Sequence, residues 1–226
     1  SSARAASVII RRWWDRFQHL PDAVIVEGPL AGGHLGFKPE QIDDAAYALP
    51  QIFSEVVKTV NEMAKEHNRT IPVIAAGGIY TGADMLEYFR LGASGVQMAT
   101  RFVTTFECDA SWAFKQSYLD AKKEDLIIIK SPVGMPGRAI RNQFIDDVNR
   151  GQRKPYKCPY RCIVTCDVKN SPYCIANSLV NAQRGHLKSG FAFAGANAYL
   201  ADTIVSVKQL MATLVAEYRA AAHTSA

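Results

Sequence analysis

The feature that most constrains this chain is a pattern that recurs in its first hundred residues: short, β-branched apolar runs that end in small residues. The runs are AVIVEG (23–28), IPVIAAGG (71–78) and SGVQMATRFV (94–103). Continuous apolar runs of this length are typical of strands that are buried on both faces, as in a parallel sheet. The chain is therefore expected to build a buried sheet.

Amphipathic helical patterns separate these runs and predict helices over 3–17, 50–66 and 81–93. Pro50 suits a first helical turn, and Thr81 is a candidate N-cap. The order helix, strand, helix, strand, helix, strand predicts an α/β fold with a parallel sheet. The apolar positions with helical spacing are Ala6, Ile9, Ile10, Trp13 and Phe17 in the first helix, and Ile52, Val56, Val60 and Met63 in the second.

After about residue 105 the pattern changes. Residues 108–125 are expected to be helical, and 126–148 predict a short strand, a Pro/Gly turn and a helix. Residues 149–174 are basic and rich in cysteine, and 205–222 predict an amphipathic helix with Ser206 as its cap. The residues expected to share one face of that last helix are Val207, Leu210, Met211, Leu214 and Tyr218.

Composition excludes several classes of protein. With 226 residues, 48% hydrophobic and 21% charged, the chain has the balance of a globular protein with a substantial core. No apolar run is long enough to span a membrane, and the first residues lack the pattern of a signal peptide. The net charge of +5 is spread out without a basic stripe, so no nucleic acid is expected. An odd number of cysteines, five, favours a reducing, cytoplasmic location.

Each predicted strand ends in a loop with few side chains, which is where parallel α/β folds bind ligands. Glycine lets backbone N–H groups approach a ligand, and a helix amino terminus adds a partial positive charge. Two consecutive strand–loop–helix segments with such loops indicate a phosphate site. The alternative is that the glycines only form tight turns. The residues are Gly28, Gly32, Gly33 and Gly36 after the first strand, Gly77, Gly78 and Gly82 after the second, and Gln97, Met98, Ala99 and Thr100 in the third.

His34 lies in the first of these loops. Neutral imidazole is the natural base for a weakly acidic proton near neutral pH, so His34 is the candidate catalytic base. The alternative is a histidine that is only solvated or hydrogen-bonded locally. That alternative is preferred for the histidines outside any such loop, His19, His67, His186 and His223.

Three segments of the chain resemble the nitronate monooxygenase family, formerly called 2-nitropropane dioxygenases. These are FMN-dependent barrel enzymes related to flavin-dependent enoyl-acyl-carrier-protein reductases. The resemblance covers residues 1–105 and resumes at GRAIRNQF (137–144) and GFAFAGANAYLADTIVSVKQL (190–210). The segments that carry it are EGPLAGGHLG (27–36), IPVIAAGGI (71–79) and GVQMATRF (95–102).

The resemblance implies that His34 is the base, which removes a proton from the carbon next to a nitro group or lies beside an acyl substrate. It places Gly32 near the flavin ring and implies a ring contact for Glu27, where many members have glutamine. Ala99 stands where the family usually has glycine, which is tolerable if its φ is negative. The other residues implied for FMN are Gly33 in the same loop, the phosphate-binding pair Gly77 and Gly78, and the segment Gln97, Met98, Ala99 and Thr100, whose N–H groups and threonine hydroxyl hold the phosphate.

The resemblance also implies a TIM (β/α)8 barrel, which needs eight strands. The sequence predicts only three, which match the family's last three, so we expect the carboxyl-terminal part of a longer enzyme whose amino-terminal half of the barrel is missing. The predicted parts are 1–105, the carboxyl-terminal part of the FMN-binding barrel; 106–190, an inserted, mostly helical lid subdomain; and 191–226, a closing segment and C-terminal helix.

Four cysteines are crowded into one segment: Cys158, Cys162, Cys166 and Cys174. On a helix the first three would share one face, but zinc sites and ferredoxins favour other spacings. The interpretation preferred from sequence is that they are small buried hydrophobic residues of a lid. A zinc or iron–sulfur site is the alternative, and no metal ligand is assigned.

Three functions follow from these observations. The first is an FMN-dependent oxidoreductase that oxidises alkyl nitronates or nitroalkanes with O2. The second is an NAD(P)H-dependent flavin enoyl-thioester reductase, and the third a non-catalytic, Cys-rich metal-binding or interaction module. The expected partners of the enzyme are a nitronate or acyl thioester and either O2 or NAD(P)H, with a homodimer left open.

Overall fold

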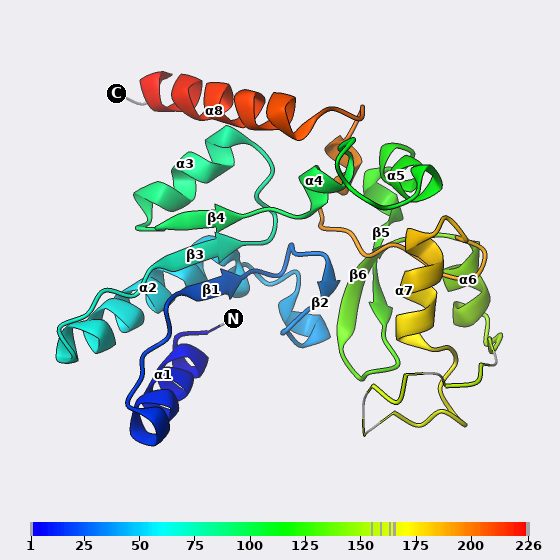
Figure 1. Ribbon diagram of the computed structural model, residues 1–226, viewed down its shortest axis with the longest axis horizontal. Helices are drawn as coiled ribbons and strands as arrows, with labels where there is room; N and C mark the ends of the chain where they lie inside the picture. The colour runs from blue at the N-terminus through cyan, green and yellow to red at the C-terminus, as the bar shows by residue number, and fades with distance from the viewer. Residues whose placement is uncertain (1, 155, 159, 163, 165, 225–226) are drawn as a thin grey trace. The chain divides into compact units, whose positions relative to one another are not determined.

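The computed structural model describes residues 2–154, 156–158, 160–162, 164 and 166–224. The chain folds into two compact units (Figure 1). Each unit combines stretches that are far apart in the sequence, whereas the three predicted parts follow the chain in order. The first unit contains Ser1–Ala31, Pro39–Ala99 and Lys208–Ala226, and the second contains Gly32–Lys38 and Thr100–Val207.

The first unit is an α/β unit around a parallel three-stranded sheet of order β1-β3-β4. This confirms the α/β class and the three predicted strands. In Figure 1 the helix α3 lies beside β4, and α8 lies over α3. The strands are β1 (Val24–Glu27), β3 (Val73–Ala76) and β4 (Gly95–Gln97), and the helices are α1 (Ala3–Phe17), α2 (Leu49–Glu66), α3 (Gly82–Arg90) and α8 (Val207–Thr224).

Local sequence explains where α2 and α3 form. Pro50 lies in the first turn of α2, and the predicted apolar face of that helix is buried, with Val60 fully so. The side chain of Thr81 accepts a hydrogen bond from the N–H of Asp84, whose carboxylate accepts one from the N–H of Thr81. This reciprocal capping box confirms the predicted start of α3.

The predicted faces of two other helices are only partly buried. In α1 only Ile10 is buried, while Ile9, Trp13 and Phe17 are exposed. In α8 Leu210 and Leu214 are buried, but Met211 is 48% exposed. Helical spacing identifies which side chains share a face, but how much of that face is covered depends on what packs against it.

The predicted strand over 94–103 is too long. Pairing stops at Gln97, which lies opposite Ala76, the last residue of β3. Gly77, the residue after β3, has a φ of +90° and leaves the sheet. The described part of β3 therefore offers β4 no pairing residue beyond Gln97. The chain then enters a short helix, α4 (Thr100–Val103).

The second unit contains an antiparallel sheet of order β2-β6-β5. Its β5–β6 hairpin shows that the 106–190 segment is not helical throughout, and the strand over 136–140 was not predicted because Pro and Gly at its start are typical of turns. The predicted helix over 108–125 is shorter and starts after the cap Ser111. The strands are β2 (Gly33–His34), β5 (Leu126–Lys130) and β6 (Pro136–Ile140), and the helices α5 (Trp112–Leu119), α6 (Gln143–Asn149) and α7 (Ile175–Gln183).

Short 3-10 turns complete the described structure at Pro39–Gln41, Ala45–Tyr47, Lys123–Asp125 and Ala198–Leu200. Within the described part of the chain, no helix combines the length and the apolar character that a membrane crossing needs.

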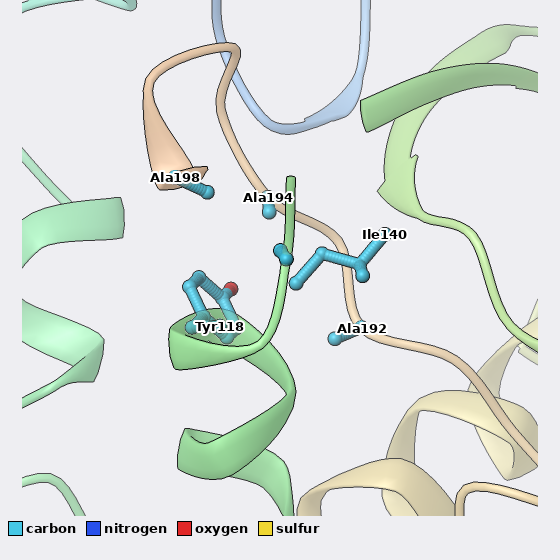
Figure 2. Close-up of a cluster of buried hydrophobic side chains, with 6 residues drawn as sticks. Tyr118, Ile140, Ala192, Ala194 and Ala198 are labelled. Carbon is cyan, nitrogen blue, oxygen red and sulfur yellow. The ribbon is translucent and has the colours of Figure 1, made fainter. Parts of the chain in front are cut away.

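Small side chains shape one core of the second unit. Tyr118 of α5 and Ile140 of β6 pack against a run of alanines in the segment 192–198 (Figure 2). The hydroxyl of Tyr118 donates a hydrogen bond to the carbonyl oxygen of Phe193 in that segment. Because alanine leaves room for close approach, the segment can pair with β6, where the N–H of Ile140 donates to the carbonyl oxygen of Ala192.

A close backbone contact in the first unit joins α8 to α3. The carboxylate of Glu217 accepts a hydrogen bond from the N–H of Gly82 at 2.7 Å. A Cβ at position 82 would lie 2.2 Å from the nitrogen of Tyr218 and 2.3 Å from the carbonyl oxygen of Leu214. Both are backbone atoms, so they cannot move aside cheaply.

We therefore expect Gly82→Ala to destabilise the protein by about 2 kcal/mol, the usual cost of overpacking. Urea unfolding monitored by circular dichroism measures the change. Gly95→Ala is the matched control, because its Cβ would lie 3.9 Å from the nearest neighbour, Cγ1 of Ile74. Equal stabilities of the two variants would contradict the expectation.

Candidate active site

In the first unit, the residues expected to bind a ligand lie along one edge of the sheet. Glu27 pairs with Ala76, and Ala76 pairs with Gln97, so the three strands end in register. Gly77 and Met98 are the next residues along the chain. The structure thus brings together Glu27, Gly77, Gly78, Gln97, Met98 and Ala99, as parallel strands require.

The glycine pair after β3 has two structural roles of its own. Gly77 and Gly78 have φ values of +90° and +82°, which L side chains rarely adopt. A Cβ on Gly78 would lie 2.8 Å from Cβ of Leu30, and one on Gly77 would lie 3.0 Å from Cβ of Ala31. The tight-turn interpretation is therefore sufficient to explain these glycines, and phosphate binding at the same backbone stays a prediction.

The loop after β4 is accessible. Gln97 and Ala99 are exposed and Met98 is partly buried. Ala99 is not among the described residues with positive φ, so alanine meets the condition for replacing glycine there.

Glu27 is half-buried at the end of β1. Burial raises the pKa of its carboxyl above the ordinary value of 4.5, because an ionised carboxylate loses hydration there. A carboxyl in such a place favours its neutral form more than an exposed one does.

The amino terminus of α3 does not fit the anion-binding role that we expected for the loop around Gly82. Two of its N–H groups already have side-chain acceptors: that of Gly82 donates to the carboxylate of Glu217, and that of Asp84 donates to the hydroxyl of Thr81. The partial positive charge of this helix end is thus complemented by a carboxylate of the chain itself.

In the second unit, the glycines before His34 permit close packing. A Cβ on Gly32 would lie 2.5 Å from the backbone of Ala194 and Gly195. Gly33 has a φ of +84° and pairs with Arg138 of β6. These contacts explain why the loop before His34 has so few side chains.

His34 is held on β2 by several partners. Its Nε2 lies 2.7 Å from the Oγ of Ser131, a side chain that is 3% exposed. The ring of Phe193 meets the imidazole edge-on, with centroids 5.0 Å apart. Burial lowers the pKa of His34 below the ordinary value of 6.5. The imidazole is therefore neutral at neutral pH, which is the form that a general base needs.

Thr100, the last of the expected phosphate-binding residues, is the first residue of the longer stretch of the second unit. Its Oγ1 accepts a hydrogen bond from the N–H of Gly195 at 2.9 Å. A hydroxyl that accepts one hydrogen bond can still donate its own proton, so this contact is compatible with a role towards phosphate.

Ser131 and Phe193 were not singled out from the sequence. Ser131 follows the apolar run of β5 in the turn of the β5–β6 hairpin, where its backbone N–H donates to the carbonyl oxygen of Met135. Nothing in the sequence shows that this turn meets His34, because the contact spans 97 residues.

The cysteines of the 158–174 segment are not all small buried hydrophobic residues, as the sequence led us to expect. Only Cys174 is buried, and Cys162 is exposed. The described residues between 156 and 173 form no helix, so the helical spacing of the first three cysteines does not apply. Among the described residues, no group of three or more His, Cys, Asp or Glu side chains could hold a metal ion.

The first unit has accessible loops at the ends of its strands, and a neutral histidine lies in the stretch of chain that follows β1. Both features are typical of enzymes that act on small molecules. A family model described as nitronate monooxygenase matches residues 1–217. The chain belongs to the nitronate monooxygenase family, which confirms the resemblance.

Curated relatives agree with this assignment. A protein of Staphylococcus saprophyticus named "Probable nitronate monooxygenase" is 35% identical over 169 residues, 75% of this chain and 44% of the relative. A protein of the same name from Staphylococcus aureus is 31% identical over 189 residues, 82% of this chain and 49% of its own. This chain spans about half the length of these relatives.

Two solved structures share the fold. FabK from Thermotoga maritima superposes with a TM-score of 0.73 at 28% identity, over 99% of this chain and 60% of its own. A nitroalkane oxidase from Streptomyces ansochromogenes gives a TM-score of 0.70 at 24% identity, over 100% of this chain and 58% of its own. Both matches show that this chain shares the fold of these proteins over nearly its whole length.

The raised pKa of Glu27 has a consequence for stability. Because the folded-state pKa is raised, the unfolded state ionises more readily, and stability is lost as the pH rises through the folded pKa. We expect Glu27→Gln to stabilise the protein at pH 7 by about 0.5 kcal/mol, since solvent screens a half-buried group, and to have no effect near pH 3. Thermal unfolding at both pH values measures this, with exposed Glu62→Gln as the control. A destabilised Glu27→Gln variant at pH 7 would contradict it.

Proposed function

We propose that this chain is part of an FMN-dependent oxidoreductase that oxidises alkyl nitronates or nitroalkanes with O2, with His34 as the catalytic base. The observation that carries the proposal is the state of His34: a neutral imidazole, fixed by Ser131 in a chain of the nitronate monooxygenase family. In this proposal the parallel strands β1, β3 and β4 belong to a (β/α)8 barrel.

The described residues fit a flavin phosphate at the sheet edge of the first unit. Two neighbouring strands end in register there, followed by glycines with positive φ and by an accessible loop. Backbone at such strand ends is suited to phosphate. When bound, FMN would supply the electron-transfer chemistry. The proposed FMN-binding residues are Glu27, Gly77, Gly78, Gln97, Met98 and Ala99 in the first unit, and Gly32, Gly33 and Thr100 in the second.

His34 supplies the proton chemistry. If Nε2–H donates to the Oγ of Ser131, the lone pair of Nδ1 faces away from that contact and is available to a substrate. The edge-on ring of Phe193 restricts rotation of the imidazole. Ser131 therefore acts as a positioning residue that holds the imidazole at Nε2. The tautomer with its proton on Nε2 is the one in which Nδ1 accepts the proton of the substrate.

The second candidate is an NAD(P)H-dependent enoyl-thioester reductase, which the match to FabK favours. Two assays distinguish the candidates: one supplies an alkyl nitronate and O2, and the other supplies NADPH and an enoyl thioester. We expect a bound flavin spectrum and O2 uptake with an alkyl nitronate in the absence of pyridine nucleotide. Prompt flavin reduction by NADPH, with turnover of an enoyl thioester, would favour the reductase instead. A colourless protein that binds no added FMN would reject both.

We expect His34→Ala to retain flavin but to lower turnover of a neutral nitroalkane by about 10²–10⁴-fold, the usual contribution of a general base. Steady-state O2 uptake measures this. Since burial lowers the pKa of His34, the wild-type rate should rise with pH and level off with an apparent pKa below 6.5. His186→Ala is the control, because that histidine is exposed. A His34→Ala variant with a near-normal rate would exclude this role.

A further inference from the structure

A cavity of about 410 Å³ in the second unit is lined by the turn of the β5–β6 hairpin and by the segment that joins α6 to α7. Its volume falls within the usual range of pockets that bind small molecules. The function proposed above makes no use of this cavity. It is therefore a candidate binding site of its own.

The lining of the cavity is largely apolar. Aliphatic side chains come from Val133 of the hairpin turn and from Val164 and Val168 of the segment. Free cysteine packs as a small hydrophobic residue, and the cysteines of the segment line the cavity as well: Cys158, Cys162, Cys166 and Cys174. An apolar chain that binds here releases water from these side chains, which favours binding.

Several apolar side chains of the segment are left exposed. Val164 is fully exposed, Tyr160 is 47% exposed and Val168 is 38% exposed. A group of exposed apolar side chains beside a cavity is typical of a surface that a ligand or partner covers. The segment thus offers apolar surface both inside the cavity and at its border.

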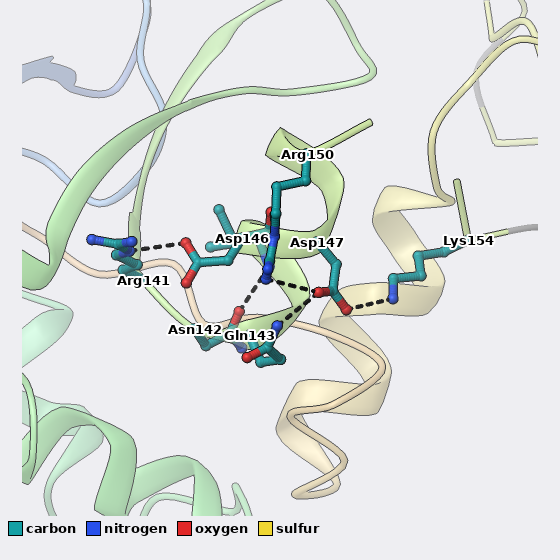
Figure 3. Close-up of polar contacts among 8 residues, drawn as sticks. Arg141, Asn142, Gln143, Asp146, Asp147, Arg150 and Lys154 are labelled. Carbon is teal, nitrogen blue, oxygen red and sulfur yellow. Dashed lines mark hydrogen bonds and ion pairs between the residues drawn. The ribbon is translucent and has the colours of Figure 1, made fainter. Parts of the chain in front are cut away.

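Both ends of the segment are fixed, so the wall that it forms is held in place. At its start the carboxylate of Asp147 in α6 lies 2.8 Å from Nζ of Lys154 and 3.2 Å from the guanidinium of Arg150 (Figure 3). The N–H of Lys154 donates a hydrogen bond to the carbonyl oxygen of Pro172 at 2.8 Å. This bond joins the start of the segment to its end.

The charge around the cavity is positive. From 148 to 166 every charged residue is basic. Arg161 is the one charged side chain among the described residues that line the cavity, and within the described part of the chain no carboxylate pairs with it. The nearest acidic residue in the sequence, Asp167, accepts hydrogen bonds from the N–H groups of Lys169 and Asn170 in its own turn. The cavity therefore presents a guanidinium that lacks a counter-ion.

The backbone of Arg161 has an unusual conformation. Its φ is +44°, a region that residues other than glycine rarely adopt. Its N–H donates a hydrogen bond to the Sγ of Cys158 at 3.4 Å, which fixes the backbone of Arg161 against another residue of the lining. Residues held in such conformations are concentrated at ligand sites, and this observation points to the same residue as the charge does.

We propose that this cavity binds an amphiphilic anion, with its alkyl chain among the valines and cysteines and its carboxylate on the guanidinium of Arg161. The planar guanidinium matches the two oxygens of a carboxylate. A neutral or cationic amphiphile has the same apolar chain but gives Arg161 no counter-ion. The proposal does not depend on the role of His34 or on flavin.

Isothermal titration calorimetry of the chain with decanoate, below the concentration at which it forms micelles, tests the proposal. We expect saturable binding with a negative heat-capacity change, because apolar surface is buried. Each methylene removed from the alkyl chain should weaken binding about fourfold. Decyltrimethylammonium, which has an alkyl chain of the same length and the opposite charge, should bind more weakly than decanoate.

Arg161→Asn is the informative variant. The side chain is exposed, and asparagine adopts a positive φ more readily than most residues, so we expect the variant to fold, as judged by circular dichroism. It should bind decanoate about fivefold more weakly, the upper range for an exposed ion pair. Lys157→Asn is the matched control, because it removes the same charge from an exposed residue that is not among those lining the cavity. It should bind decanoate as the wild type does.

An Arg161→Asn variant that binds decanoate normally would overturn the proposal, as would an equal loss of affinity in both variants. Failure of the wild type to bind decanoate saturably would overturn it too, and so would equal affinity for decyltrimethylammonium. Cosedimentation with phosphatidylglycerol vesicles in the absence of decanoate binding would assign the basic segment to a membrane surface, which contradicts a site for a single amphiphile.

Discussion

The parallel register of β1, β3 and β4 is the constraint on which the candidate site depends. Because Glu27, Ala76 and Gln97 lie side by side, the three loops that follow them start at one edge of the sheet. Gly77 turns away from the sheet with positive φ and so ends pairing on both of its sides. A shift of one residue in β3 would move the glycine pair relative to both neighbouring loops and turn the strand's other face outward.

Much of this arrangement could be predicted from short-range patterns. The positions of the strands, the face of α2 and the cap of α3 follow from apolar spacing and from Thr81 with Asp84, all within a few residues of each other. The burial expected for all three strands holds only for β3, because Ile25 of β1 is 53% exposed and no residue of β4 is buried. The end of β4 could not be predicted, because it depends on where its neighbour leaves the sheet. The strand Pro136–Ile140 was missed because Pro and Gly at its start are typical of turns, and its pairing with β2 comes from a stretch about a hundred residues away in the sequence.

The candidate site, too, could be predicted from sequence only in its short-range features. The residue types of the glycine loops and His34 identify the chemistry, but the partners of His34 come from positions 131 and 193. Several glycines that suggested a ligand also have packing neighbours, such as Ala194 against Gly32. Close backbone approach within the protein and close approach to a ligand demand the same residue, so sequence alone does not separate them.

The contact between Gly82 and Glu217 spans 135 residues of chain. During synthesis the amino end of α3 leaves the ribosome long before its carboxylate partner exists, so that helix must first rely on its own cap. The last helix therefore closes the first unit only after the whole intervening second unit has been made. Closing so long a loop is slow, and it ties the folding of two separate units to a single late event.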